Sequence, residues 1–347
     1  MIKASYKKYV LEFKNASGTS RGILKTKETW FIILEENGKI GIGETGLFRG
    51  LSIDDVPNYE KKLEWVCNNI HLGLQKLVAE VFNFPSIQFG LEQAFLSLKS
   101  VNKFQLFPSE FTKGNQAISI NGLVWMGDKD FMKQQIQEKL KKGFSCIKMK
   151  IGAINFEEEI NLLKSIRKEF SAKEIELRVD ANGAFSPKEA LEKLKILSEL
   201  DIHSIEQPIK QGQIEEMALL CQKTPLPIAL DEELIGVFSY QQKKQLLEII
   251  QPQYIILKPS LIGGFTGSND WIDVAKSNQI NWWITSALES NIGLNAIAQF
   301  TYTLNNNLPQ GLGTGSLFTN NLDSPLEVKN GALHYNNSKK WNTNLIL

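Results

Sequence analysis

Hydrophobic and polar residues alternate along the first part of the chain in the manner of antiparallel strands. Residues 2–13 form one alternating run, and residues 28–44 contain two more, separated by Asn37 and Gly38. An Asn-Gly pair suits the positive φ angles of a tight hairpin turn, so we predict a hairpin here. Helical periodicity follows in three segments, at 57–69, 72–82 and 86–98. The pattern therefore predicts an α+β module over residues 1–110.

The pattern changes at about residue 117, where a strand, a polar loop and an amphipathic helix begin to alternate until about residue 318. One such unit is the apolar run 175–180 followed by a helix over 187–200, with Ser186 and Glu189 at the spacing of a capping box. The candidate strands begin near Ile118, Ser145, Ile175, Ile202, Leu226, Tyr254, Asn281 and Leu308. Eight strands alternating with helices favour a closed parallel barrel over an open sheet.

Charged residues end five successive apolar runs of the predicted barrel. They lie 25 to 30 residues apart, the length of one strand, one helix and two loops, and are Lys150, Asp180, Glu206, Asp231 and Lys258. In a closed parallel barrel the chemistry is carried at the carboxyl ends of the strands. We therefore expect these side chains to converge at one rim.

Three carboxylates at one rim are costly to bury unless a cation holds them together. Hard oxygen ligands suit Mg²⁺, with Mn²⁺ as the second candidate, and leave room for a substrate carboxylate. Strand alternation places Lys148 and Lys150 on one face of their strand. A second ammonium and a divalent cation nearby disfavour the protonated form of Lys150, which makes it a candidate base. The expected task is stabilising the enediolate formed when a proton leaves the carbon next to a carboxylate.

The composition of the 347 residues is that of a globular protein, with 42% hydrophobic and 22% charged residues and a formal net charge of +1. This balance gives no electrostatic case for nucleic acid and favours a small uncharged or anionic substrate. Cys67, Cys146 and Cys221 lie far apart and are interpreted as reduced thiols. No signal peptide and no membrane span is predicted, so we expect a cytoplasmic protein.

Two further patterns are interpreted as structural. Residues 41–46 match the letters of a dinucleotide-binding fingerprint, but the strand before them returns from a hairpin and no helix opens at Gly46. His71, His203 and His334 lie outside the spacing of the strand ends, so we do not expect a histidine base.

Several motifs of the chain resemble those of one family of barrel enzymes. They are 148-KMK-150, 178-RVDANG-183, 205-IEQP-208, 230-LDEEL-234, 257-LKPSLIGG-264, 285-TSALES-290 and 310-QGLGTGSLF-318. Together they resemble the muconate-lactonizing branch of the enolase superfamily over nearly the whole chain. The resemblance implies a (β/α)7β-type parallel barrel over residues 111–319, preceded by an α+β capping domain over residues 1–110. We expect the tail, 320–347, to pack on the capping domain.

The resemblance also implies a role for each charged position. Lys150 would take the α-proton and return a proton to the departing hydroxyl, Lys258 would face it across the substrate, and Lys148 would affect the pKa of Lys150. The implied metal ligands are Asp180, Glu206 and Asp231. Ser286, Glu289 and Gly311 fall where the family lines its substrate pocket. Loops at 17–22 and 46–52 fall where the capping domain covers the mouth and excludes water.

The implied activity is a metal-dependent dehydration of a carboxylate in menaquinone biosynthesis, which makes the protein a lyase. A rival is 1,1-proton transfer with Lys150 and Lys258 as two bases, as in N-succinylamino acid racemases and dipeptide epimerases. The dipeptide epimerases of this branch carry an Asp-x-Asp motif where this chain has Gly311-Leu-Gly313, which argues against that specificity. A catalytically silent barrel would lack part of the constellation, which is complete here. A homo-oligomer is left open.

Overall fold

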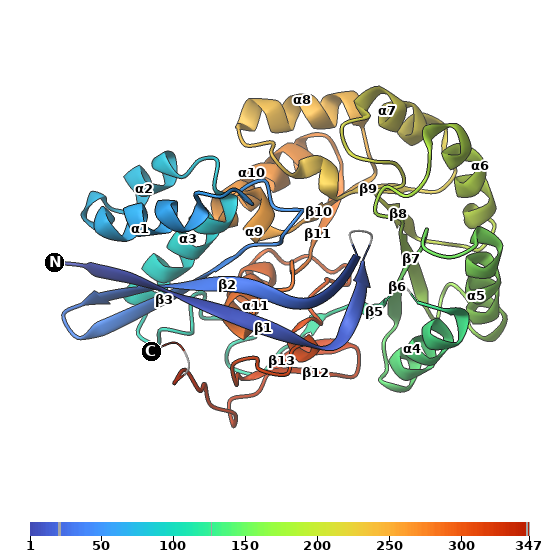
Figure 1. The fold of residues 1–347 in the computed structure, drawn as a ribbon. Helices are drawn as coiled ribbons and strands as arrows, with labels where there is room; N and C mark the ends of the chain where they lie inside the picture. The colour runs from blue at the N-terminus through green and yellow to red at the C-terminus, as the bar shows by residue number, and fades with distance from the viewer. Residues whose placement is uncertain (20–21, 126, 345, 347) are drawn as a thin grey trace.

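The computed structural model describes residues 1–347 except 20–21, 126, 345 and 347. Figure 1 shows an N-terminal module of antiparallel strands and helices beside a strongly curled parallel sheet that carries its helices on the outside. Among the described residues, no helix is long and apolar enough to cross a membrane.

The N-terminal module consists of a three-stranded antiparallel sheet and the helices packed on it. The strands β1 (Lys3–Thr19), β2 (Gly22–Glu36) and β3 (Lys39–Gly46) lie in that order in the sheet. The hairpin predicted at Asn37 and Gly38 is confirmed, with φ angles of 50° and 77°. The helices are α1 (Tyr59–Asn68), α2 (Leu74–Glu80) and α3 (Pro85–Lys99), with a 3₁₀ turn, η1 (Ile70–Leu72), between the first two.

Glycines in β3 allow α3 to lie directly against the sheet. A Cβ atom at Gly41 would stand 2.3 Å from the carbonyl oxygen of Ala94, and one at Gly43 would stand 1.9 Å from that of Gly90. Both distances are far inside van der Waals contact, so only glycine fits. The letters that match a dinucleotide fingerprint therefore reflect helix packing.

The parallel sheet has seven strands in the order β11-β10-β9-β8-β7-β6-β5. They are β5 (Gly122–Val124), β6 (Cys146–Lys150), β7 (Glu176–Asp180), β8 (Ser204–Glu206), β9 (Ile228–Leu230), β10 (Tyr254–Leu257) and β11 (Asn281–Ile284). The helices that follow them are α4 (Lys129–Lys141), α5 (Phe156–Glu169), α6 (Pro187–Ser198), α7 (Ile214–Lys223), α8 (Tyr240–Ile250), α9 (Pro259–Ile262), α10 (Gly264–Ser277) and α11 (Asn291–Thr303), with 3₁₀ turns η2 (Glu232–Leu234) and η3 (Gly315–Leu317). This arrangement confirms the predicted fold class.

The first barrel strand begins later than predicted, at Gly122 of β5, and no full strand begins at Leu308 among the described residues. Ile118 belongs to β4 (Ile118–Ser119), which pairs antiparallel with β13 (Ala332–Tyr335), the partner of β12 (Leu326–Lys329). The last segment contributes two isolated parallel bridges, Ile120 with Gln310 and Thr285 with Gly311. Pro309 has no N–H to donate to a ladder, which limits pairing on its side. The ring of strands is thus joined between β11 and β5 by two residues instead of a strand.

The helix predicted at 187–200 is α6, which begins at Pro187 and ends at Ser198. Its predicted capping box is absent, because the hydroxyl of Ser186 donates to the Glu189 carboxylate at 2.9 Å and accepts no backbone N–H. The reciprocal capping box occurs before α8, between Ser239 and Gln242.

The C-terminal tail contacts the N-terminal module at several points. Leu322 and Ile346 pack in one apolar cluster with Phe31 and Ile42, and the ring of Trp341 stacks on Phe104 with centroids 4.4 Å apart. The domain boundaries predicted at residues 110 and 319 stay a prediction.

Candidate active site at the carboxyl ends of the barrel strands

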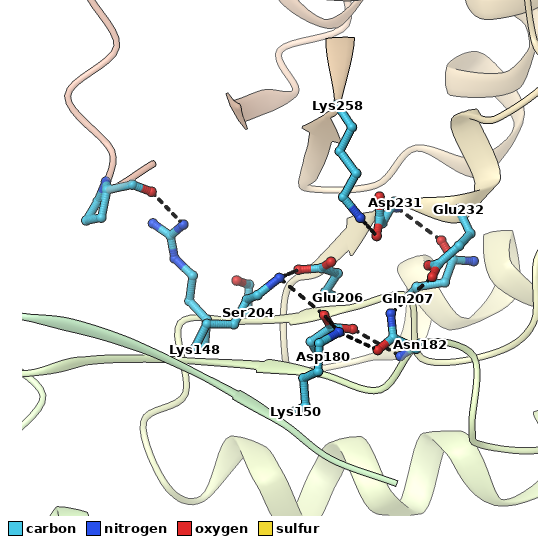
Figure 2. Close-up of polar contacts among 12 residues, drawn as sticks. Lys148, Lys150, Asp180, Asn182, Ser204, Glu206, Gln207, Asp231, Glu232 and Lys258 are labelled. Atoms are coloured by element: carbon cyan, nitrogen blue, oxygen red, sulfur yellow. Dashed lines mark hydrogen bonds and ion pairs between the residues drawn. The ribbon is translucent and has the colours of Figure 1, made fainter. Parts of the chain in front are cut away.

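Strand register brings the predicted charged residues together. Lys150, the last residue of β6, pairs with Asp180 at the end of β7, which in turn pairs with Glu206 at the end of β8. Asp231 and Lys258 directly follow β9 and β10. Lys148 lies two residues before Lys150 and points to the same side, as alternation predicts. Figure 2 shows the six side chains around one centre.

The lysines and acids form a connected set of buried ion pairs. Lys148 Nζ lies 3.2 Å from Asp180 Oδ2 and 2.6 Å from Glu206 Oε2. Lys150 Nζ donates to the same Asp180 oxygen at 2.9 Å and to Asn182 Oδ1 at 2.7 Å. Lys258 pairs with Asp231 on the other side. Asn182 is a contact that we did not single out from the sequence, although it lies inside the motif 178-RVDANG-183.

Burial and neighbouring charge shift the pKa values of this set in opposite directions. Burial alone would lower the pKa of Lys148, but the carboxylates of Glu206 and Asp180 outweigh it and raise that pKa. Burial would raise the pKa of Asp180, but the ammonium groups of Lys150 and Lys148 hold it below its ordinary value. The pKa of Glu206 lies well above its ordinary value because burial and the charge of Asp180 both disfavour a second carboxylate. Additional positive charge would therefore be stabilised beside Glu206.

The acids provide the donor set of a hard divalent cation. Oxygen Oε1 of Glu206 is buried and has no hydrogen-bond partner among the described residues, and three carboxylates supply the oxygen ligands that Mg²⁺ and Mn²⁺ prefer. Within the described part of the chain, no three histidine, cysteine or acidic side chains lie close enough together to hold a metal ion as they stand. The ammonium group of Lys148 lies between the carboxylates of Asp180 and Glu206. The residues thus fit the metal by chemistry, and their role as ligands stays a prediction.

A pocket opens beside the charged centre. Its lining residues are Phe48, Leu51, Asn121, Gly122, Leu123, Trp125, Lys139, Phe144, Lys148, Lys150, Asp180, Asn182, Glu232, Lys258, Thr285, Ser286, Ala287, Leu288, Gly311, Gly313, Thr314, Ser316 and Leu317. Phe48 and Leu51 come from the loop 46–52 that we expected over the mouth. In the other expected loop, 17–22, residues 20 and 21 lie outside the described residues.

Two of the three predicted substrate-pocket residues, Ser286 and Gly311, line this pocket. The third, Glu289, is fully buried behind it, where its carboxylate accepts hydrogen bonds from the hydroxyls of Ser286 and Ser260, each at 2.5 Å. Thr314 donates to the Ser286 hydroxyl at 2.9 Å. Glu289 is therefore placed to orient a pocket hydroxyl.

Two charged residues of the N-terminal module reach this region without having been predicted. Glu44 of β3 accepts the backbone N–H groups of Ser290 and Gly293, both at 2.8 Å, at the start of α11. Lys27 of β2 is buried, and its ammonium has no hydrogen-bond partner within the described residues. Burial lowers its pKa, against the attraction of Glu289 and Glu44. Strand alternation predicts that these two side chains are buried, but it does not predict which residues they contact.

Comparison with known proteins assigns the chain and its fold to one family. The model of the family "Enolase C-terminal domain-like" matches residues 131–339. The o-succinylbenzoate synthase of Desulfotalea psychrophila is 46% identical, over 96% of this chain and 98% of that protein. The chain belongs to the enolase superfamily.

Solved structures agree with this assignment. The crystal structure of MenC from Desulfotalea psychrophila superposes with a TM-score of 0.86 at 43% identity, covering 96% of this chain and 99% of that one. A dipeptide epimerase from Enterococcus faecalis, solved with Mg and the dipeptide L-Leu-L-Tyr, shares the fold with a TM-score of 0.83 at 21% identity, with 96% of each chain covered.

Proposed function

We propose that the protein is an o-succinylbenzoate synthase. It would convert 2-succinyl-6-hydroxy-2,4-cyclohexadiene-1-carboxylate to 2-succinylbenzoate and water in menaquinone biosynthesis. The relative of this name in Desulfotalea psychrophila matches nearly the full length of both chains. The observation that carries the proposal is that Lys150 and Lys258 line one pocket together with Asp180.

In the first step, Lys150 would act as the base. Its neutral amine takes the proton from the ring carbon that bears the carboxylate, and the electron pair of the C–H bond moves into that carboxylate to give an enediolate. Lys258 lies across the centre from Lys150 and contributes a positive charge to the delocalised anion. Asn182 holds the Lys150 side chain in place through its 2.7 Å hydrogen bond.

In the second step, the same lysine would act as the acid. The electron pair returns to the ring, the bond from the neighbouring carbon to its hydroxyl breaks, and the Lys150 ammonium protonates the departing oxygen. Water leaves, and the ring becomes aromatic. Because one group removes and returns the proton, the proton and the hydroxyl must leave from the same face of the ring.

A divalent cation held by Asp180, Glu206 and Asp231 would supply positive charge to the substrate carboxylate. Enolase-superfamily sites pair a lysine or histidine base with Mg²⁺ in this way. We propose Mg²⁺ as the ion, with Mn²⁺ as the second candidate. Apolar Phe48 and Leu51 at the pocket would exclude water from the reacting atoms.

The rival activity is 1,1-proton transfer on an N-acylated amino acid. The placement of Lys150 and Lys258 on opposite sides of the centre would also serve two bases. Relatives named as epimerases match this chain at 26% identity over 60% of its length and at 27% over 86%. A cytoplasmic location stays a prediction, and the oligomeric state stays open.

The decisive experiment offers both substrate classes to the Mg²⁺-loaded protein. We expect the cyclohexadiene carboxylate to be converted, seen as an ultraviolet change when the ring becomes aromatic. Lys150→Ala should lower turnover by about 10²-fold to 10⁴-fold, the usual contribution of a general base, while the protein keeps its fold and binds the metal.

The matched control is Lys164→Ala, which removes an exposed lysine of the neighbouring helix α5 and should leave turnover unchanged. Loss of optical rotation by N-succinyl amino acids, without conversion of the cyclohexadiene, would replace the proposal with the racemase. Near-wild-type turnover by Lys150→Ala would rule out the assigned base.

A further inference from the structure

Among the residues that the structure describes, one lysine of the pocket lining forms no ion pair with a carboxylate. Four lysines line it, of which Lys148, Lys150 and Lys258 each pair with an acid of the charged centre. Lys139 of α4 is the fourth, and its side chain makes no ion pair or hydrogen bond within the described part of the chain. The pocket lining therefore has two parts: three lysines whose charges are neutralised by acids, and Lys139, whose charge is not.

Lys139 reaches the pocket through a gap left by a glycine. A Cβ atom at Gly122 would stand 3.1 Å from the Cγ and Cδ atoms of Lys139 and 3.1 Å from Cγ of Phe144. The aliphatic stem of Lys139 thus lies against the bare backbone of β5, where any larger residue would push it away. The sequence gives no hint of this approach, since Lys139 belongs to a helix on the outside of the barrel.

The ammonium end of Lys139 is half-buried and lies beside an aromatic ring. Its Nζ atom is 5.5 Å from the ring centroid of Phe144, which is itself buried and lines the pocket. Burial lowers the pKa of Lys139, the charge of Lys142 lowers it further, and the adjacent Glu138 is the one acid that opposes them. This ammonium group is partly removed from water, and Glu138 offsets only part of the cost. Binding of an anion beside it is therefore favourable.

The position of Lys139 relative to the base fits a substrate with two acid groups. Lys139 and Lys150 line the same pocket, although Gly122, against which Lys139 lies, pairs with Ile147, whose side chain points away from the face of Lys148 and Lys150. The substrate of the proposed function carries one carboxylate on the ring and a second at the end of a flexible succinyl chain. When the ring carboxylate lies at the charged centre, the chain can extend within the same pocket past Gly122 to Lys139.

We propose that Lys139 binds the distal carboxylate of the substrate, with Gly122 and Phe144 forming the wall that admits it. This assignment rests on the proposed function and adds to it a basis for selectivity. A dicarboxylate would be accepted, whereas a dipeptide would present its ammonium group to Lys139 and be repelled.

The test compares two stable ligands that differ in this carboxylate. The affinities of 2-succinylbenzoate and of 2-butanoylbenzoate, which lacks the distal carboxylate, are measured by calorimetry on the Mg²⁺-loaded protein. Lys139→Met keeps an apolar stem over Gly122 and removes the charge. We expect it to weaken 2-succinylbenzoate about tenfold or more, the effect of losing one charge-assisted hydrogen bond, and to leave 2-butanoylbenzoate within about twofold.

Two further variants complete the experiment. Lys139→Arg should restore the preference for the dicarboxylate, and Lys142→Met, which removes the exposed lysine just after α4, should behave as wild type. In turnover assays Lys139→Met should raise KM and leave kcat nearly unchanged, because the reacting atoms lie elsewhere.

The proposal is overturned if Lys139→Met weakens both ligands equally, if it weakens neither, or if the wild type binds neither ligand. Failure of the proposed function has a different signature. In that case the wild type would not convert the cyclohexadiene substrate, while the selective loss of dicarboxylate affinity in Lys139→Met would still be measured.

Discussion

At the scale of single residues, Asp231 tests the assignment of the metal ligands. Its carboxylate pairs with Lys258 and lies among the three acids of the centre. Asp231→Asn keeps the shape of the side chain and removes its charge, so we expect divalent affinity to fall at least tenfold and turnover to fall with it. Calorimetric titration with Mg²⁺, repeated with Mn²⁺, measures the effect directly.

Loss of a buried ion pair could by itself disturb the protein, so this variant needs a matched control. Asp270→Asn removes the carboxylate that pairs at 2.9 Å with Lys243, a lysine as deeply buried as Lys148 but located between α8 and α10. We expect Asp270→Asn to lose stability and keep its affinity for Mg²⁺. Unchanged Mg²⁺ affinity in Asp231→Asn would move the ligand to another acid.

Strand residues of the site could be predicted from the sequence because alternation and register are local rules. Lys148 and Lys150 are two residues apart in one strand, so they had to share a face, and both contact Asp180 in the structure. Lys139 could not be predicted in the same way. Its place in the pocket depends on the missing side chain of Gly122 and on how α4 packs, and neither is encoded in the spacing of charges.

At the scale of elements, the pattern of apolar runs predicted the strands β6 to β11 and misplaced the first and last strands of the barrel. The runs at Ile118 and Leu308 resemble strands, but the first pairs with the C-terminal hairpin and the second supplies only two bridging residues. A run of apolar residues specifies burial and does not specify its partner. Gly311 in the last segment lies so close to Thr285 that a Cβ atom there would stand 2.4 Å from the threonine hydroxyl oxygen, so this position requires glycine.

The loop between β3 and α1 shows how one buried acid affects a helix. Asp54 accepts the backbone N–H of Ser86 at 3.0 Å and its hydroxyl at 2.6 Å, at the first turn of α3. Its other oxygen is buried and has no partner within the described residues. Burial raises the pKa of Asp54 to about 6, in spite of the hydrogen bonds from Ser86 that lower it.

This shift predicts a pH dependence of stability with a defined sign. The ordinary pKa of Asp54 is 3.8, so the folded state binds its proton more tightly than the unfolded state. The stabilisation is complete below that value and is lost as the pH rises to about 6, by roughly 3 kcal/mol at most. Asp54→Asn removes this dependence, so we expect it to gain stability relative to wild type as the pH rises from 4.5 to 7.

Urea unfolding at a series of pH values measures the difference, and the neighbouring residue provides a control of opposite sign. Burial would raise the pKa of Asp55, but the N–H of Gly50 and the guanidinium of Arg49 hold it below its ordinary value. The contribution of Asp55 is therefore present at neutral pH and lost in acid, and Asp55→Asn should lose stability relative to wild type as the pH rises. A difference between wild type and Asp54→Asn that does not vary with pH would contradict the assignment.

At the scale of the whole molecule, two buried glutamates connect the N-terminal module to the barrel helices. Glu44 of β3 accepts the N–H groups at the start of α11, and Glu92 of α3 accepts that of Phe265 at 2.5 Å at the start of α10. A carboxylate at a helix start satisfies backbone donors and complements the helix dipole. A Cβ atom at Gly264 would stand 2.2 Å from the Glu92 carboxylate, so this contact also requires glycine.

These contacts make the covering module part of the same cooperative unit as the catalytic barrel. Each glutamate is buried, so replacing its carboxylate with an amide turns an accepted N–H bond into a clash of donors and costs about 1–3 kcal/mol. In the double variant Glu44→Gln/Glu92→Gln, we expect the N-terminal module to unfold at lower urea than the barrel. The wild type should unfold in one transition.

Hydrogen exchange read by mass spectrometry separates the two parts, since peptides from 22–46 report on the module and peptides from 146–180 on the barrel. Glu35→Gln/Glu80→Gln changes two exposed acids of the same module and should leave a single transition. Because Phe48 and Leu51 cover the pocket from this module, the double variant should also lose turnover before its barrel unfolds. If both groups of peptides in the double variant exchanged together, at the urea midpoint of the wild type, the two glutamates would not be needed for coupling. The apolar contacts alone would then couple the module to the barrel.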